Sequence, residues 1–237
     1  WDFKKNTLYK RDLMIIDLIA HNNWERPIYF SITVGNSASA FMHLTEHFEL
    51  EGMAYKLVPI QYPMRGGNQF GHVDSQTMFN NMMNEFQWGN LNDRDVYLDE
   101  TNRRMTWSIR NNFGRLAGQL VEEGRLDQAM QAADRALEIV HEDVIPFDYF
   151  VLPLAEVYYR GNNKAKAGEV ILKVGETMRD ELLYYAQFEG DEQRMIEQDI
   201  RQSMSIFNAA VQIARQYQDQ QTVATLNEMQ QVWSGKL

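Results

Sequence analysis

The spacing of apolar residues changes along the chain and divides it into two parts. Residues 27–34 alternate apolar and polar side chains, which is the period of a half-buried strand. From residue 101 onward apolar residues recur every three or four positions, which is the period of helices packed along one side. The pattern predicts an α+β fold: a small α+β domain over residues 1–100, packed on an all-α helical-hairpin domain over residues 101–237.

The first 100 residues are predicted to hold three helices and two strands. The first helix is dense in aliphatic residues, so we expect it to be buried. The second strand contains Pro59, which indicates either its end or a sheet edge. The predicted helices cover residues 11–21, 39–48 and 76–88, the strands residues 27–34 and 54–60, the long loop residues 61–75, and the acidic connector residues 89–100.

Residues 111–140 carry the pattern of a tetratricopeptide repeat, a hairpin of two helices. The first helix has an apolar face and ends near Gly124, because glycine readily adopts the left-handed conformation found after a helix end. The second helix, after Gly124, has a face lined with alanine. The matching positions are Phe113, Leu116, Ala117, Leu120, Gly124, Ala129, Ala133 and Ala136. A second hairpin is expected over residues 150–187, with a kink at Pro153. A third, degenerate capping repeat is expected over residues 191–233, with Ala224 in the alanine position.

The first helix of each such hairpin lines a concave groove that can hold an extended peptide. Asn, Arg and Tyr suit contacts with a peptide backbone and with carboxylates. The residues predicted to face this partner groove are Asn111, Arg115, Glu122, Tyr149, Glu156 and Tyr159. An alternative is that residues 1–100 fill the groove, which would make it an internal interface.

Composition narrows the classes of partner. The formal net charge is −10, and residues 1–100 and 101–237 carry −5 each, so we expect no nucleic-acid partner. There are no cysteines, which removes disulfides and thiolate chemistry. No stretch approaches the ~18 apolar residues of a membrane-spanning helix. Because the chain begins with Trp, we expect it to be a piece of a longer protein.

One short motif suggests catalysis. His43, Glu46 and His47 form HxxEH, and on a helix the two imidazoles would lie on one side, with the glutamate available as a base toward a metal-bound water. A zinc-dependent hydrolase is therefore the enzymatic alternative. A functional site would also need a third ligand and a rigid helix, and the simpler interpretation is an exposed polar face. We expect no catalytic residue, metal or other cofactor in this chain.

Two further stretches could bind ions. Acidic residues between positions 92 and 100 offer oxygen ligands for calcium, but their spacing departs from the calcium-binding loop, and helix capping is an alternative role. The glycine-rich stretch over residues 66–71 lacks the lysine of a phosphate-binding loop and is expected to be a flexible loop.

Several stretches together resemble the soluble C-terminal part of a family of multi-pass membrane proteins of Bacteroidetes. They are LYKRDLMIIDLIAHNNWERPIYFSITV, FELEGMAYKLVPI, WGNLNDRDVYLD and RNNFGRL, followed by the repeats. The family, otherwise of unknown function, is described as related to protein O-mannosyltransferases, glycosyltransferases of the C-type fold. The resemblance implies that the sugar-transfer chemistry belongs to a membrane-embedded part, and that this domain lies on the periplasmic side of the inner membrane.

These observations predict a non-catalytic domain of a glycosyltransferase-like membrane protein that binds a protein or a peptide. The partner could be the membrane part of its own parent protein. In a third alternative the domain is purely structural and braces that membrane part.

Overall fold

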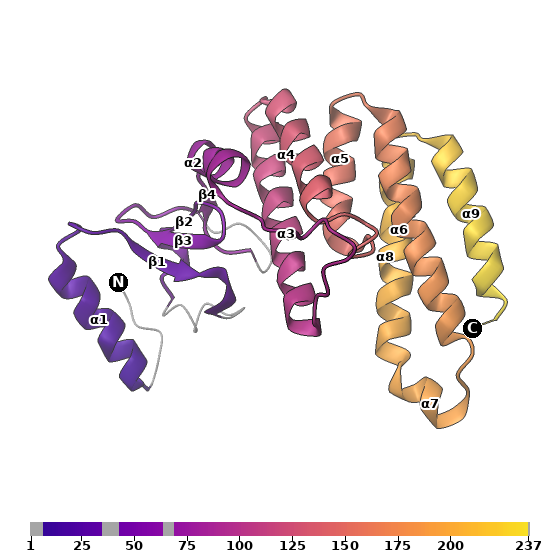
Figure 1. The fold of residues 1–237 in the computed structure, drawn as a ribbon, viewed down its shortest axis with the longest axis horizontal. Helices are drawn as coiled ribbons and strands as arrows, with labels where there is room; N and C mark the ends of the chain where they lie inside the picture. Colours follow the sequence, from indigo (N-terminus) through magenta and orange to yellow (C-terminus); the bar gives the residue numbers. More distant parts are fainter. Residues whose placement is uncertain (1–6, 35–42, 64–68, 237) are drawn as a thin grey trace. The chain divides into compact units, whose positions relative to one another are not determined.

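The chain divides into two compact units, Trp1–Phe86 and Gln87–Leu237 (Figure 1). The structure is a computed structural model that describes residues 7–34, 43–63 and 69–236. Each unit has its own hydrophobic core. A small sheet lies in the first unit and the second unit is helical, which confirms the α+β class. The domain boundary predicted after residue 100 falls at the start of α3 (Glu100–Glu122).

The first unit is built on a four-stranded mixed sheet with the order β1-β3-β2-β4. The central hairpin pairs β2 with β3, β1 pairs antiparallel with β3, and β4 runs parallel to β2. The strands are β1 (Ile28–Ser31), β2 (Phe48–Leu50), β3 (Ala54–Leu57) and β4 (His72–Val73). The helical segments are α1 (Lys10–Asn22), η1 (Ile32–Val34), η2 (Thr45–His47), α2 (Ser75–Asn80) and the π-helical η3 (Asn81–Glu85).

Aromatic side chains from β1, β2 and β3 pack together and hold the sheet together. The ring of Phe48 lies 5.0 Å from that of Phe30 on β1 and 5.3 Å from that of Tyr55 on β3, and all three side chains are buried. The predicted alternation is confirmed in β1, where Phe30 is buried and its neighbours Tyr29 and Ser31 are exposed. Both predicted strands exist but are shorter than predicted, and β3 ends before Pro59.

The predicted burial of the first helix is wrong. The helix forms as α1, but Asp12 is its only buried residue. Leu13, Met14 and Leu18 are each more than half exposed. A dense aliphatic run therefore predicted the helix correctly, but it did not show whether another surface covers it.

The helix predicted over residues 39–48 is also wrong where the structure describes it. Its first part, residues 39–42, lies outside the described residues. From His43 the chain makes a turn with φ of 56°, continues as η2 and enters β2 at Phe48. Because β2 has only three residues, its extended form depends on pairing with β3, which no local pattern encodes.

The helix predicted over residues 76–88 is confirmed in part. Asp74 caps it by accepting a hydrogen bond from the backbone N–H of Thr77, so α2 begins at Ser75. The helix widens into η3 and ends at Glu85, before Phe86. Met82 is fully buried.

The second unit contains three helical hairpins in succession. α3 pairs with α4 (Leu126–Ile139), α5 (Leu152–Arg160) pairs with α6 (Lys164–Tyr185), and α8 (Glu197–Gln216) pairs with α9 (Gln220–Ser234). Short segments η4 (Tyr149–Val151) and α7 (Gly190–Met195) precede α5 and α8. α5 packs against both helices of the first hairpin, whereas α8 and α9 both pack against α6. Figure 1 shows α3 and α4 at one end of this unit and α9 at the other.

The first hairpin buries the side chains that the sequence pattern selected. Phe113, Leu116, Ala117, Leu120, Ala129, Ala133 and Ala136 are all fully buried. Gly124 adopts a φ of 76°, the left-handed conformation expected after the end of a helix. The kink predicted at Pro153 is wrong, because Pro153 lies in the first turn of α5, where its missing N–H removes no helical hydrogen bond.

Glycine allows α6 and α9 to approach closely. A Cβ at Gly168 would lie 2.7 Å from Thr222 Oγ1, and one at Gly175 would clash with the side chain of Leu226. Because α9 buries Thr222, Leu226, Met229 and Trp233 against this surface, Ala224 is exposed. The prediction that Ala224 fills a buried alanine position is therefore wrong.

Candidate functional site

One side of α3 presents a row of partly exposed side chains. Trp107, Asn111, Arg115 and Glu122 are spaced four, four and seven positions apart, which places them on the same side of a helix. Trp107 is 42% exposed, Asn111 and Arg115 are half-buried and Glu122 is exposed. Gly118 lies in the same row, and a Cβ there would meet nothing within 4 Å. We call these five residues the α3 row. The space next to Gly118, between Arg115 and Glu122, is open.

Aromatic rings extend the α3 row toward the second hairpin. The ring of Phe150 lies 6.4 Å from that of Trp107, and the ring of Tyr149 lies edge-on to Phe150 at 5.8 Å. Tyr149 is 57% exposed. We call Trp107, Tyr149 and Phe150 the aromatic cluster. It joins α3 and η4 into one surface of rings, on the same side of α3 as Asn111 and Arg115.

A buried arginine fixes the loop that carries two of these rings. The side chain of Arg110 is fully buried, and its guanidinium donates to the backbone carbonyls of Val140 (3.0 Å), Ile145 (2.5 Å) and Pro146 (2.8 Å). Its charge also lies 5.3 Å from the ring centroid of Phe147. Because this loop leads into η4, the contacts of Arg110 position Tyr149 and Phe150.

Asp148 completes the same anchor. Its carboxylate lies 3.6 Å from Arg110 Nη1 and accepts a hydrogen bond of 2.9 Å from the backbone N–H of Phe150. Burial raises the pKa of Asp148, and the charge of Arg110 opposes this rise. Burial lowers the pKa of Arg110 to about 10, so the guanidinium still carries its charge at neutral pH. The ion pair of Arg110 and Asp148, with its hydrogen bonds, thus fixes the position of the aromatic cluster.

The structure gives the six predicted groove residues different environments. Glu122 and Tyr149 are exposed, and Asn111, Arg115 and Glu156 are half-buried. Tyr159 is only 8% exposed, so its side chain lies inside the packing of the second unit. The sequence pattern also failed to select Trp107 as a surface residue. The position of Trp107 one helical turn before Asn111 could have predicted that both lie on the same side of α3.

Tyr159 joins the second hairpin to the third. Its hydroxyl donates a hydrogen bond of 2.9 Å to Asp219, and its ring stacks on that of Tyr217 at 4.6 Å with an interplanar angle of 6°. Asp219 also caps α9 by accepting from the backbone N–H and the hydroxyl of Thr222. Burial raises the pKa of Tyr159, so its hydroxyl stays protonated and donates.

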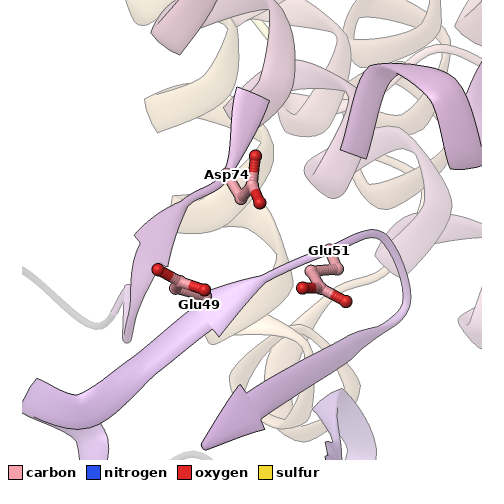
Figure 2. A group of neighbouring side chains, drawn as sticks. All are labelled: Glu49, Glu51 and Asp74. Carbon is pink, nitrogen blue, oxygen red and sulfur yellow. The ribbon is translucent and has the colours of Figure 1, made fainter. Parts of the chain in front are cut away.

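A second group of polar residues lies in the first unit. Glu49 on β2, Glu51 beyond the end of β2 and Asp74 beyond the end of β4 bring their carboxylates within 4.8 Å of one another (Figure 2). The parallel pairing of β2 with β4 places Glu49 opposite His72 and so brings Asp74 close. Carboxylate oxygens are the ligands that calcium and magnesium prefer.

Protein donors already occupy these carboxylates. Glu51 accepts from the hydroxyl of Tyr29 at 2.6 Å and from Lys56 Nζ at 2.8 Å, and Glu49 accepts from the hydroxyl of Tyr62. Asp74 caps α2. Burial and the hydrogen bond to Glu49 raise the pKa of Tyr62 to about 12, and the hydrogen bond to Glu51 raises the pKa of Lys56. Each of the three carboxylates therefore has its own protein donor, and the contacts of Glu51 link β1 to β3.

The HxxEH residues do not share a helix. His43 lies in a left-handed turn, whereas Glu46 and His47 belong to η2. His47 Nδ1 lies 3.0 Å from the backbone carbonyl of Ile60, and Glu46 accepts from the side chain of Gln61. Among the described residues, Glu49, Glu51 and Asp74 form the one set of three or more ligand side chains that converges, and the HxxEH residues are not in it.

The remaining candidate stretches have structural roles where they are described. Asp99 caps α3 by accepting from the backbone N–H of Asn102, which supports the capping alternative to calcium binding. Asp93 accepts from the backbone N–H of Asp95 within the connector. Residues 66–68 of the glycine-rich stretch lie outside the described residues.

Sequence comparison adds one finding on the first part of the chain. Residues 1–77 match the family described as TMEM260-associated domain 2. This segment includes α1, all four strands and the acidic group of Glu49, Glu51 and Asp74. It is therefore similar to a domain that accompanies a family of membrane proteins. No curated protein and no solved structure gave a significant match.

Over residues 7–34, 43–63 and 69–236, no helix combines the length and the apolar character needed to cross a bilayer.

Proposed function

We propose that the chain is a non-catalytic domain that binds a protein or peptide through the α3 row and the aromatic cluster. The observation that carries this proposal is the contact of exposed Trp107 and Tyr149 with Phe150, on the side of α3 that carries Asn111 one turn from Trp107 and Arg115 two turns from it. Trp, Tyr and Arg are the residues most enriched among the energetically dominant contacts of interfaces.

The same surface offers two kinds of contact. The rings supply apolar area with few rotatable bonds, so little conformational entropy is lost on binding. Asn111 can pair with a peptide backbone, and Arg115 can pair with a carboxylate. Arg110 and Asp148 hold the loop before η4 in place, which lowers the cost of ordering the surface.

We propose further that the hairpins of the second unit are tetratricopeptide-like repeats. The complete burial of the seven patterned residues in α3 and α4 supports this, as does the packing of α5 against both helices of the first hairpin. The third hairpin packs mainly on α6, which fits a degenerate capping repeat.

The parent protein is, in this proposal, a membrane-bound glycosyltransferase-like protein of Bacteroidetes that holds this domain on the periplasmic side. The match of residues 1–77 to a TMEM260-associated domain supports the membrane association. The same match supports a second candidate function, in which the domain braces the membrane part. Deleting the domain would then destabilise the parent protein, while substitutions in the α3 row and the aromatic cluster would have no effect on its stability.

The proposal is tested by measuring peptide binding to the complete chain on a peptide array and in solution. We expect the combined variant Trp107→Ala and Tyr149→Ala to weaken binding by roughly 30-fold or more, since each hot-spot truncation costs about 1–2 kcal/mol. Arg115→Gln is expected to weaken binding of carboxylate-bearing peptides selectively. Gly118→Trp should block the surface, because the position has open space around it.

Tyr184→Ala provides the matched control. Tyr184 is 57% exposed, the same fraction as Tyr149, and it contacts Tyr185 and Phe188 on the surface of α6 and the loop that follows. We expect this variant to bind peptides like the unmodified chain. Binding that survives the Trp107 and Tyr149 substitutions and the Gly118 block, or that Tyr184→Ala weakens equally, would contradict the proposal.

A further inference from the structure

α1 exposes three large aliphatic side chains. It has 13 residues, and its one buried residue is Asp12, whose carboxylate accepts from the backbone N–H of Tyr9. Leu13, Met14 and Leu18 are 54%, 65% and 53% exposed. Contiguous exposed aliphatic residues of this kind mark a surface that another medium or molecule covers.

Exposed aromatic residues flank α1 at both ends. Tyr9 precedes the helix and is 60% exposed, and Trp24 follows it and is 52% exposed. The chain between them leaves the helix through left-handed conformations at Asn23 and Trp24. Tyr and Trp side chains are enriched where a hydrocarbon region meets water, because each has an apolar ring and a polar group.

The charge of this segment differs from that of the rest of the chain. Residues 1–34 contain five basic and four acidic residues, a net of 5 − 4 = +1, whereas residues 35–237 carry 18 − 29 = −11. Lys10 and Arg11 at the start of α1 are exposed. An anionic lipid surface would therefore attract this end of the helix while it repels the remainder of the chain.

We propose that α1 binds a lipid surface, lying along the interface with Leu13, Met14 and Leu18 in contact with the acyl chains. Thirteen residues are too few to span a bilayer, so the helix lies on the membrane and does not cross it. Lys10 and Arg11 contact anionic headgroups, with their aliphatic stems along the apolar layer. The similarity of residues 1–77 to a domain that accompanies membrane proteins agrees with this position.

One acidic residue opposes binding. Asp17 is exposed one turn beyond Leu13 and Met14 and adjacent to Leu18, so it lies among these three aliphatic side chains. Its carboxylate lies 3.1 Å from His21 Nδ1. An unneutralised carboxylate costs free energy near an anionic headgroup layer. The geometry therefore assigns Asp17 a weakening role that a substitution can reveal.

The experiment is vesicle flotation of the complete chain with two kinds of vesicle. One contains phosphatidylcholine alone, and the other contains phosphatidylcholine with phosphatidylglycerol. We expect the chain to float with both and to bind the anionic vesicles more tightly. The triple variant Leu13→Gln, Met14→Gln, Leu18→Gln should lose at least about tenfold in partition coefficient on both, because each change removes apolar side chain from the lipid layer.

Two charge variants separate electrostatic from apolar binding. Lys10→Gln should weaken binding to the anionic vesicles and leave phosphatidylcholine binding unchanged. Asp17→Asn should strengthen binding to the anionic vesicles. Met195→Gln is the matched control, since Met195 is 79% exposed on α7 in the other unit, and we expect it to float like the unmodified chain.

Three outcomes would overturn the proposal. The chain could fail to float with either vesicle, the triple variant could float as well as the unmodified chain, or Met195→Gln could weaken binding equally. Sedimentation of the same variants identifies the competing occupant. A concentration-dependent dimer that the triple variant abolishes, without flotation, would show that a second copy of the chain covers α1. Circular dichroism confirms that the glutamine variants keep their helix.

Discussion

Arg110 and Asp148 form an ion pair across the loop between the first two hairpins, with 3.6 Å between Nη1 and Oδ2. The arginine side chain is fully buried, and that of Asp148 is 21% exposed. The guanidinium also satisfies three backbone carbonyls of the loop that ends at Asp148. One side chain of α3 thus supplies hydrogen-bond donors to three carbonyls of this loop.

We expect Arg110→Met to lower the free energy of unfolding by about 3–5 kcal/mol, because it leaves buried carbonyls without donors and Asp148 without its cation. Chemical denaturation of the complete chain measures the loss. Arg201→Met is the matched control: Arg201 pairs with Glu197 one turn away, with both side chains more than half exposed. That change should cost less than about 0.5 kcal/mol. Equal effects of the two substitutions would show that Arg110 does not hold the loop.

Two glycines in helices should respond in opposite directions to alanine. Gly175→Ala is expected to destabilise the chain by about 1–3 kcal/mol, because its Cβ would collide with Leu226 between α6 and α9. Gly118→Ala should stabilise it by about 0.5–1 kcal/mol, since the position on α3 is open and alanine favours the helix. Thermal and urea unfolding of both variants measure the difference. A stabilising Gly175→Ala would mean that α6 and α9 are further apart than described.

The first hairpin could be predicted because its information is local. Phe113, Leu116 and Leu120 follow the helical period, and Gly124 marks the end of the helix within the same stretch of sequence. The apolar period over three helical turns predicts the helix, and a glycine that can adopt the left-handed conformation predicts where it ends. The side of α3 that carries Asn111 and Arg115 follows from the same period.

The features that sequence analysis missed depend on distant pairing. The extended form of β2 requires β3, and the burial of Tyr159 requires Asp219, which is 60 positions away. The predicted burial of Ala224 assumed that the third hairpin repeats the packing of the first, whereas α9 lies on α6 through two glycines. The aromatic cluster likewise joins Trp107 to Phe150 across the first hairpin and its loop. The spacing of apolar residues predicts which side of a helix is buried, but it does not predict which element packs against that side.

Divalent cations should have little effect on the stability of the first unit. The carboxylates of Glu49, Glu51 and Asp74 already accept hydrogen bonds from Tyr62, Tyr29 and Thr77. A cation would have to replace these donors, so we expect the midpoint of thermal unfolding to stay unchanged when calcium, zinc or a chelator is added. Metal analysis of chain purified without chelators gives an independent measurement. Stoichiometric zinc that His43→Ala removes would instead support the hydrolase alternative.

Glu181 provides a prediction of how stability depends on pH. Its carboxylate on α6 accepts a hydrogen bond of 2.7 Å from Ser203 on α8, and partial burial raises its pKa above the ordinary value of 4.5. The negative charges of Asp148 and Asp199 raise it further, and the hydrogen bond from Ser203 opposes the shift. Because the folded state binds the proton more tightly than the unfolded state, this group makes the chain less stable as pH rises from about 4.5 through the folded pKa.

Glu181→Gln keeps an oxygen that can accept from Ser203 and removes the charge. We expect the variant to be more stable than the unmodified chain at pH ~8, by less than about 1 kcal/mol because solvent screens a partly buried group. The difference should disappear at pH ~3, where the glutamate is protonated in both states. Urea unfolding at the two pH values measures it. Asp180→Asn, next to Glu181 but 66% exposed, should show no comparable gain at pH ~8. A difference that persists unchanged at low pH would indicate that Glu181 acts through packing, and its charge would then have no part in the effect.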